Sequence, residues 1–354
     1  MKMNKWTMAL AAAGVVSLSS VAQAQEAAAG ANALAASTTL SGYVSTSYTT
    51  SDVATSRDSF ELDVVDLKFA SAQGAGEYAT GYTVELWAGP DASDLGTGGS
   101  GTVEMMQANI DLRVPVGNGL DLKVGQFQTV VGHETYNKNE NAFFTRSFGF
   151  AVEPTHHTGL LASYQASDDL AISVGFVNDT TSAATNDDNG GTAYLVSLSY
   201  TIPDSAGFLS GTQLTYARVD GANGSGAATS EVDSQYLGMS IPLPVEGLSY
   251  NLAWDIRENG GTDADDNVLG HYLSYAVNDS VTINARYETG NLNSEQDSSS
   301  LGVENYDGLS STSIGLDYKL WENVISRVEY ISSDWDSNAN GADESVVFNI
   351  IYNF

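Results

Sequence analysis

The sequence predicts an all-β protein, a transmembrane antiparallel β-barrel of about 16 strands with long outer loops and short periplasmic turns. Three observations lead to this prediction. Apolar and polar residues alternate with a period of two, long and short connections alternate along the chain, and the last alternating stretch ends in an aromatic residue. Together they place the barrel over residues 39–354.

The alternation begins at residue 39, where stretches of about ten residues switch between apolar and polar side chains and then end in turn residues. In residues 248–257, Tyr250 and Trp254 fall on one face, whereas Asp255 and Arg257 fall on the other. Successive side chains of a strand point to opposite faces, so each strand has an apolar face and a polar face.

The polar faces distinguish a membrane barrel from a soluble one. Acidic and basic residues recur on them, and a soluble barrel would have to turn these charges outward and fill its interior with the apolar set. With many strands the interior is too wide to fill, whereas an apolar surface in lipid around a wet lumen fits both faces. The polar faces supply the predicted pore-lining residues, which are Lys68, Asp111, Arg113, Asp121, Lys123, Asp255, Arg257, Arg286, Glu288, Asp317, Lys319, Arg327 and Glu329.

The connections give an independent signal. Eight long, polar connections cover residues 49–59, 88–102, 132–157, 179–192, 219–232, 259–265, 289–309 and 334–344. Seven short turns alternate with them, at residues 71–76, 115–119, 166–169, 203–207, 244–247, 278–279 and 321–323. Outer-membrane barrels have long loops outside the cell and short turns in the periplasm, and both termini in the periplasm give an even strand number.

The first residues carry a targeting signal. Lys2 and Lys5 precede a short apolar run over residues 6–18, and Ala22 and Ala24 offer small residues for cleavage. This layout predicts a cleaved signal peptide at residues 1–24. The Ala-rich residues 25–38 then form a periplasmic N-terminal tail, and we expect the mature protein in the outer membrane of a Gram-negative bacterium.

The carboxyl-terminal stretch alternates up to the last residue. Val346, Phe348, Ile350, Tyr352 and Phe354 share one face. The stretch is similar to the closing strand of outer-membrane barrels. We therefore expect the barrel-assembly machinery to recognise the chain through Phe354.

The charge balance limits the partners. The sequence has 44 acidic and 13 basic residues, a net charge of −31. Binding nucleic acid requires a basic face, so nucleic acid is excluded as a partner. An acidic protein instead attracts cations, either as permeating ions or as bridges to anionic groups of outer-membrane lipid or lipopolysaccharide.

Catalytic and metal-binding patterns are missing from the sequence. It contains no Gly-x-Ser-x-Gly, no His-Glu-x-x-His and no cysteine, so we expect neither an enzyme nor a cofactor. His156 and His157 are adjacent, and adjacent side chains of an extended chain point in opposite directions. We therefore expect no metal site there.

The longest connection, residues 132–157, is too long to lack a role. One possibility is that it folds into the lumen and narrows it. The other is that it folds outward, over the mouth or against a neighbouring subunit. If it folds inward, the candidate constriction residues are its charged members, Glu134, Lys138, Glu140, Arg146 and Glu153.

The same region carries a family resemblance. Gly125-Gln-Phe-Gln-Thr129 is followed by Gly132-His-Glu134, by Asn139 and Asn141, and by Glu153-Pro-Thr-His-His-Thr-Gly159. This pattern resembles the OmpL-like β-barrel porins, although Val130 and Val131 stand where such proteins often have proline. The resemblance implies a porin without catalytic residues. By analogy with 16-stranded porins it also implies a third loop that folds inward and possible assembly as a homotrimer.

We therefore predict an outer-membrane porin that allows passive diffusion of small hydrophilic solutes or ions. Acidic outer loops favour a mild preference for cations, moderated by arginines of the lumen. A basic arc facing an acidic loop would set a transverse field across the passage. Two alternatives stay open: a structural or adhesive barrel with a plugged lumen and acidic surface loops, and a secreted soluble all-β protein.

Overall fold

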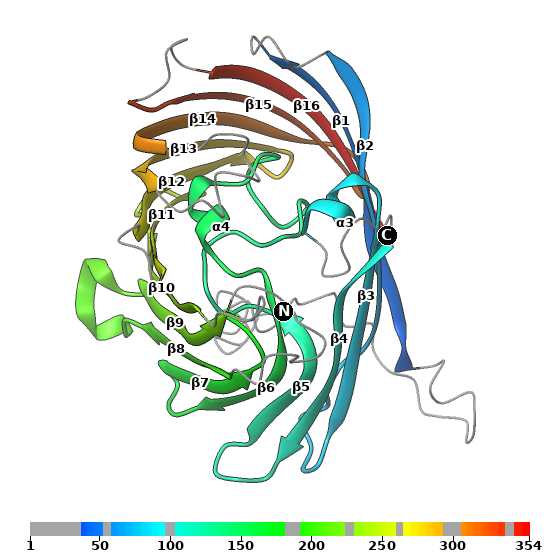
Figure 1. Cartoon of the computed structure of the whole chain (residues 1–354), viewed down its shortest axis with the longest axis vertical. Helices are drawn as coiled ribbons and strands as arrows, with labels where there is room; N and C mark the ends of the chain where they lie inside the picture. The colour runs from blue at the N-terminus through cyan, green and yellow to red at the C-terminus, as the bar shows by residue number, and fades with distance from the viewer. Residues whose placement is uncertain are drawn as a thin grey trace.

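The computed structural model describes residues 37–51, 58–95, 103–180, 192–223, 230–259, 265–292, 306–336 and 343–354. They form a closed barrel of 16 strands in which each strand pairs with its neighbour in sequence and β1 pairs with β16 (Figure 1). Every pairing is antiparallel. The predicted fold class is confirmed.

The strands span most of the described chain. They are β1 (Thr39–Ser51), β2 (Ser59–Ser71), β3 (Thr80–Ala88), β4 (Val103–Val114), β5 (Leu120–Gln128), β6 (His156–Gln165), β7 (Leu170–Val177), β8 (Ala193–Thr201), β9 (Gln213–Asn223), β10 (Ser230–Pro242), β11 (Leu248–Asn259), β12 (Asp265–Asn278), β13 (Val281–Leu292), β14 (Tyr306–Trp321), β15 (Val324–Asp334) and β16 (Asp343–Asn353). β1 begins at Thr39, the residue where the alternation in the sequence begins.

The long connections from β3 to β4, from β5 to β6, from β7 to β8 and from β13 to β14 have shorter neighbours as predicted, whereas the connection from β9 to β10, expected to be long, is short. The turn between β14 and β15 is short, and Asn323 in it has a φ of 64°, a left-handed conformation that asparagine tolerates. One expected short turn, at residues 203–207, is instead a longer connection with a 3-10 helix, η1 (Asp204–Leu209). The predicted signal peptide and the predicted tail up to residue 36 lie outside the described residues.

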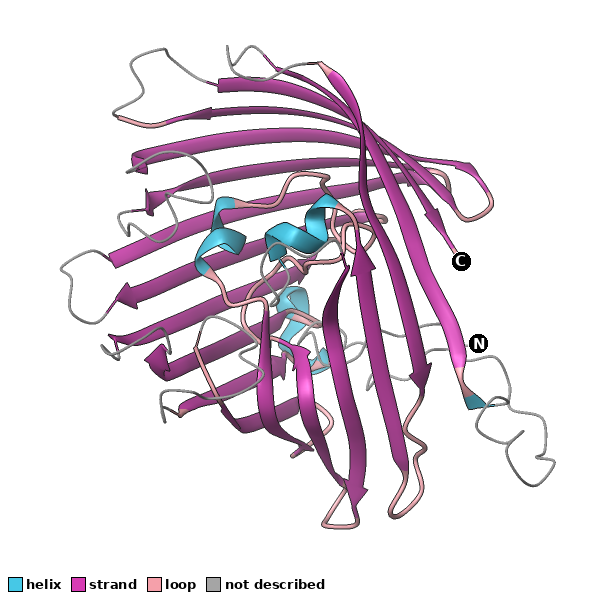
Figure 2. Cartoon of the chain, turned by 45° about the vertical axis from the view of Figure 1, so that its right-hand side comes forward, coloured by secondary structure: helices cyan, strands magenta, loops and turns pink. Residues whose placement is uncertain are grey.

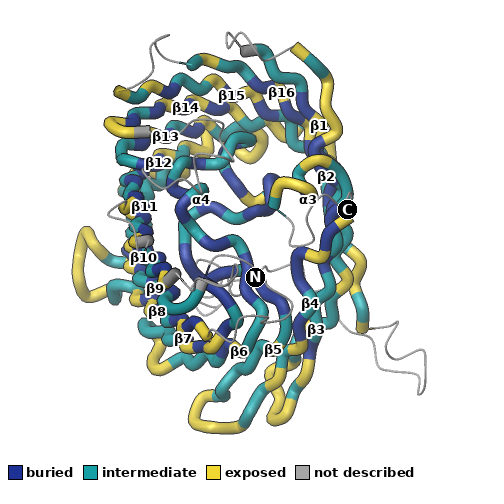
Figure 3. The backbone as a smooth tube through the Cα atoms, viewed as in Figure 1, coloured by how far each residue is buried: buried dark blue, intermediate teal, exposed yellow. Residues whose placement is uncertain are grey.

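The two faces of the strands have opposite character. Trp254 and Phe348 point outward and are 42% and 49% exposed, whereas Asp255 and Arg257 point inward and are buried. Figure 3 shows buried and exposed positions alternating along the strands. A surface of exposed apolar side chains around a polar interior is the arrangement that a barrel needs in lipid.

Two of the long connections fold into the interior. The connection from β3 to β4 contains α3 (Pro90–Leu95), and the connection from β5 to β6 contains α4 (Phe148–Val152); Figure 2 shows both helices inside the barrel. Within the described ranges, no helix has the length and apolar character to cross a membrane.

The barrel closes where the last residue meets the first strand. The backbone N–H of Gly42 donates to the carbonyl of Phe354 at 3.0 Å, and the N–H of Phe354 donates to the carbonyl of Gly42 at 3.0 Å. Gly42 permits a very close approach of β2, because a Cβ at this position would lie 2.0 Å from the carbonyl oxygen of Asp66. The close pairing of β1 with β2 therefore favours a glycine at position 42.

We predict that Gly42→Ala destabilises the barrel, because its methyl group would separate β1 from β2. Overpacking of this kind costs about 1–3 kcal/mol. The free energy of unfolding of the refolded protein, measured in urea, would report it. Gly76→Ala is the matched control, because a Cβ there meets no atom within 4 Å. Equal stability of the two variants would contradict the prediction.

Candidate functional site

Residues 129–155, the connection from β5 to β6, fold inside the barrel; we call them the lumen loop. The loop leaves β5, crosses the interior and returns through α4 to β6 (Figures 1 and 2). Its hydrogen bonds reach β1, β13, β15 and β16, on the far side of the barrel from β5. It is thus folded inward, one of the two arrangements that the sequence allows.

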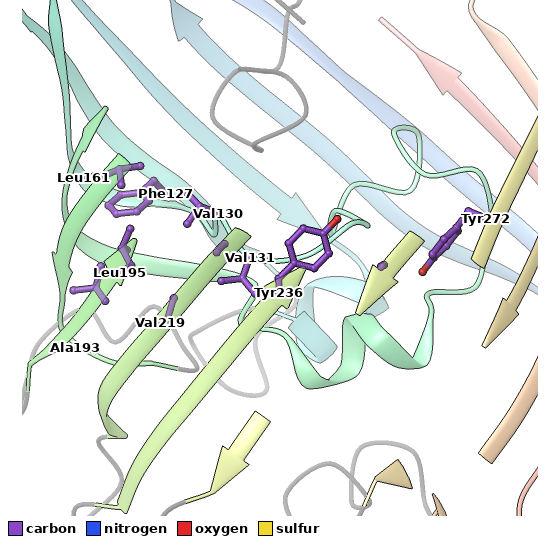
Figure 4. Close-up of a cluster of buried hydrophobic side chains, with 12 residues drawn as sticks. Phe127, Val130, Val131, Leu161, Ala193, Leu195, Val219, Tyr236 and Tyr272 are labelled. Carbon is purple, nitrogen blue, oxygen red and sulfur yellow. The ribbon is translucent and has the colours of Figure 1, made fainter. Parts of the chain in front are cut away.

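Apolar packing holds the beginning of the loop. Val130 and Val131 are buried in a cluster with Leu161 of β6, Leu195 of β8 and Tyr236 of β10. Figure 4 shows these side chains gathered between the first residues of the loop and the wall. Removing this apolar surface from water stabilises the base of the loop in place.

Arg286 of β13 is the main polar anchor. Its guanidinium is 2.8 Å from a carboxylate oxygen of Glu134 in the loop and 3.1 Å from one of Glu288 on its own strand. It also donates to the carbonyl oxygen of Thr145 at 3.0 Å and to the hydroxyl of Ser313 at 3.0 Å. The Arg286 side chain is 1% exposed, so these contacts take the place of the hydration that the guanidinium has in water.

Neighbouring strands hold the backbone of the same segment. A carboxylate oxygen of Glu329 in β15 accepts from the N–H groups of Phe144 and Thr145, at 2.7 and 3.0 Å. Arg327, also in β15, donates to the carbonyl oxygen of Asn141 at 2.8 Å. Hydrogen bonds between charged side chains and backbone groups are stronger than neutral ones, so the segment has a defined position.

The far tip of the loop reaches β1 and α3. The N–H of Lys138 donates to the hydroxyl of Tyr43 at 3.2 Å, and its ammonium lies 2.9 Å from Asp91 in α3. The amide of Asn139 donates to Asn353 of β16 at 2.9 Å. The two inward connections therefore support each other.

The start of α4 is tied to the anchor. Ser147 caps the helix by accepting the N–H of Phe150 at 2.9 Å, and its own N–H donates to Glu134 at 2.7 Å. The N–H of Gly149 donates to Glu288 at 3.2 Å. Glu134 thus joins Arg286 of the wall to the helix of the loop.

All the predicted pore-lining residues except Lys319 fall into two groups, which share Arg327. One group forms ion pairs along the wall: Lys68 with Glu85 at 3.2 Å, Arg113 with Asp121 at 2.6 Å, Lys123 with Asp111 at 2.9 Å, Arg257 with Asp266 at 3.0 Å, and Arg327 with Asp317 at 2.6 Å. The other group, Asp255, Arg286, Glu288 and Glu329, is buried beneath the lumen loop together with Arg327. Lys319 is exposed near the periplasmic end of β14.

This placement changes the expected electrostatics. Arg286 and Arg327 bind the loop and do not face open water. The basic arc opposite an acidic loop is therefore not formed by these two residues. Of the constriction candidates, Glu134, Lys138 and Arg146 hold loop contacts, and the carboxyl group of Glu153 lies against the backbone of Gly132. Glu140 is exposed to the interior.

A cavity of about 260 Å³ lies between the loop and the wall of β9 and β10. Its lining from the loop is Thr129, Val130, Val131, Gly132, His133, Glu134, Thr135 and Glu140, and from the wall Gln128, Gln213, Thr215, Tyr236, Gly238, Met239 and Ser240. The lining contains two carboxyl groups and neither lysine nor arginine. These wall residues were not predicted from the sequence, because the prediction rests on charged side chains of the polar faces, whereas most of the wall residues are neutral polar ones that recur on every strand.

The protein environment affects titration in this region. Partial loss of hydration inside the barrel raises the pKa of the Glu140 carboxyl group above its usual value, and the nearby positive charge of Lys68 opposes this effect. Burial lowers the pKa of His133 below 6.5, so its imidazole is neutral at neutral pH. No group of three or more His, Cys, Asp or Glu side chains suited to a metal ion occurs among the residues that the structure describes.

The comparisons with known proteins agree with this architecture. The family described as "Putative beta-barrel porin-2, OmpL-like" matches residues 37–354. The chain belongs to this porin family. A comparison with curated proteins found no match. The family places the protein in the outer membrane as a porin and confirms the resemblance carried by the Gly125–Gly159 pattern.

Solved porin structures share the fold. Salmonella typhi OmpF in complex with daunomycin has a TM-score of 0.64 at 12% identity, covering 90% of this chain and 97% of that chain. An anion-selective porin from Comamonas acidovorans has a TM-score of 0.61 at 15% identity, covering 90% and 99%. The trimer form of OmpT, an outer membrane protein of Vibrio cholerae, has a TM-score of 0.62 at 11% identity, covering 90% and 99%.

We predict that Arg286→Met loosens the lumen loop of this porin, because Glu134 and Glu288 lose their shared cation. Removing one partner of a buried pair costs about 3–5 kcal/mol. Urea unfolding should show the loss, and trypsin should cleave the loop faster. Arg113→Met is the control, because the Arg113–Asp121 pair lies outside the loop contacts and partly exposed pairs contribute about 0–1 kcal/mol. Similar losses in both variants would show that Arg286 is not the anchor.

Proposed function

We propose that this porin conducts small hydrophilic solutes and inorganic ions by passive diffusion, with a mild preference for cations. The observation that carries the proposal is the cavity beside the lumen loop. Its polar lining consists of hydroxyl, amide, imidazole and carboxyl groups, beside the apolar side chains of Val130, Val131 and Met239, and contains neither lysine nor arginine. In this proposal the cavity is part of the permeation path, and the lumen loop sets its width.

The cation preference rests on where the charges lie. Apart from Lys319, which is exposed near the periplasmic end of β14, the basic side chains of the described wall are engaged in ion pairs, as Lys123 is with Asp111, or hold the loop, as Arg286 does. Glu140 is exposed to the interior and has no cationic partner within ion-pair distance among the described residues. A carboxylate next to a narrow aqueous path attracts cations and repels anions.

A barrel that serves only as a structural or adhesive element is the second candidate. The observation that favours it is the density of contacts beneath the loop, where Arg286, Glu288 and Glu329 are at most 1% exposed. A loop fastened this firmly would also serve as a plug. The two candidates differ in whether the folded protein conducts.

The remaining proposals concern export and assembly. The sequence of residues 1–24 supports export through a cleaved signal peptide, and the backbone bonds of Phe354 at the closing strand support its role as the assembly signal. A homotrimer is supported by the fold shared with the trimer form of OmpT. The net charge of −31 supports cation-bridged contact with lipopolysaccharide.

The first test is conductance of the refolded, detergent-purified protein in planar bilayers, with the reversal potential under a KCl gradient. Stepwise openings and a reversal potential of the sign set by potassium support the proposal. Absence of conductance from a protein that is folded in the bilayer would favour the structural barrel. Stepwise openings with a chloride preference would keep the channel and remove the cation preference.

We predict that Glu140→Gln lowers the permeability ratio of potassium to chloride. A unit charge about 4 Å from an ion contributes about 1 kcal/mol in water, so we expect a decrease of about two- to fivefold. The reversal potential measures it. Glu246→Gln is the charge-matched control, since Glu246 is exposed in the turn between β10 and β11. An unchanged ratio in Glu140→Gln would remove this residue from the path.

The raised pKa of Glu140 predicts how selectivity changes with pH. A carboxyl group with a raised pKa takes up its proton at a higher pH than an ordinary glutamate. Acidification should therefore reduce the cation preference, and the reduction should begin above the pH at which an ordinary glutamate titrates. Glu140→Gln should show a flatter dependence of the reversal potential on pH. The same dependence in both proteins would assign it to another group.

A further inference from the structure

Acidic side chains outnumber basic ones beneath the lumen loop. Five carboxyl groups gather there: Glu134 and Glu153 from the loop, Asp255 from β11, Glu288 from β13 and Glu329 from β15. We call these five residues the carboxyl cluster. Arg286 is the cation that three of them share, at 2.8 Å from Glu134, 3.1 Å from Glu288 and 3.9 Å from Glu329. One guanidinium cannot neutralise five ionised carboxylates.

Glu153 and Asp255 are the two members of the cluster that do not contact Arg286. Their carboxyl groups are hydrogen-bonded to each other. Among the described residues, neither lies within ion-pair distance of a lysine or arginine. Two carboxyl groups can form a direct hydrogen bond only if one of them carries a proton, since ionised carboxylates are acceptors only.

The backbone of the loop encloses this pair. A Cβ at Gly132 would lie 1.8 Å from a carboxyl oxygen of Glu153, and a Cβ at Gly149 would lie 2.5 Å from one of Asp255. Gly132 has a φ of 106°, which is left-handed and favours glycine. Two segments of the loop, at Gly132 and at Gly149 in α4, thus lie directly against the carboxyl pair. A change in the charge of this pair would therefore change its contact with the loop.

A bound cation is the other way to hold an acidic pair. The cluster does not offer one a site, because no three acidic or histidine side chains in the described ranges are arranged to ligate a metal ion. The two carboxyl groups instead contact each other. Burial, followed by the charge of Asp255, raises the pKa of Glu153 well above the usual carboxyl range, as expected for a group that keeps its proton.

We propose that Glu153 and Asp255 form a proton-binding site that fastens the lumen loop to β11, so that loss of the shared proton at alkaline pH releases this part of the loop. At neutral and acidic pH the pair holds the proton and the loop is fixed. As the pH rises, the proton leaves, and the two adjacent carboxylate charges repel each other. The loop is therefore held to β11 at pH values below the range in which the pair loses its proton, and it is released at higher pH.

The groups around the pair do not replace the proton. The loop contributes Glu134 and a neutral His133, and β10 and β12 contribute Tyr236 and Tyr272. From β13, Arg286 is engaged by Glu134 and Glu288. The remaining charges nearby are Glu329 of β15, which accepts from the loop backbone, and the pair of Arg257 in β11 with Asp266 in β12, at 3.0 Å.

The experiment measures the full-length refolded protein at a series of pH values from neutral to alkaline. One readout is single-channel conductance in planar bilayers, which rests on the proposed function. The other is the rate at which trypsin cleaves the lumen loop at Lys138 or Arg146, which does not depend on conduction. We expect a step in conductance and a step in cleavage rate over the same alkaline range, with cleavage normalised to an unfolded substrate at each pH.

Asp255→Asn is the decisive variant, because an asparagine amide can donate to an ionised Glu153 and needs no shared proton. The loop should stay fastened, so both steps should be lost. Glu153→Gln should behave in the same way and serves as the second variant if Asp255→Asn does not fold. Glu246→Gln, far from the pair, should keep both steps.

Each outcome of this experiment either supports or overturns the proposal. Steps that persist in both isosteric variants, or the absence of a cleavage step in the wild-type protein, would overturn the proton site. A cleavage step that is lost in Asp255→Asn would support it even if the bilayers stay silent, and in that case only the porin proposal would fail. Ca²⁺ that removes the step at alkaline pH in the wild-type protein would support the proposal, because a divalent cation can bridge the two carboxylates only after the shared proton has left.

Discussion

The interior of this barrel depends on the ion pairing of Arg286. A guanidinium with 1% exposure is costly to bury, and the cost is offset only when carboxylates and hydrogen-bond acceptors surround it. Glu288 comes from its own strand, but Glu134 comes from the lumen loop. The wall therefore needs the loop to complete the coordination of Arg286, and the loop needs the wall to satisfy Glu134. This mutual requirement explains why so long a connection has a defined position in a wet lumen.

The same requirement shapes the electrostatics of the passage. Basic residues are scarce in this chain, 13 against 44 acidic ones, and Arg286 and Arg327 are used to bind the loop. Carboxyl groups such as Glu140 are left to face the interior, opposite neutral side chains of β9 and β10. The charge that acts on a solute is thus what remains after the loop contacts are satisfied, and composition alone does not reveal it.

The stretch that resembles the porin family coincides with the fastening of the loop. Glu134 binds Arg286, the amide of Asn141 donates to the carbonyl of Thr135 at 2.7 Å, and Glu153 shares a hydrogen bond with Asp255. In the sequence these residues form a motif, and in the structure each of them has a defined contact. The partners of Glu134 and Glu153 come from β13 and β11, more than a hundred residues later, and no local pattern links the two sets.

The sequence by itself determined the barrel, its strand number, the face of each strand and the rims to which the connections belong. These features follow from local rules: side chains alternate with a period of two, and turn residues end each strand. Only the tertiary structure decided that the long loop folds inward, that Arg286 and Glu288 lie beneath it, and that Gln213 and Thr215 line the cavity. The physical reason is that alternation reports which side of a strand is polar, whereas the contacts of a loop depend on residues brought together from distant strands when the barrel closes.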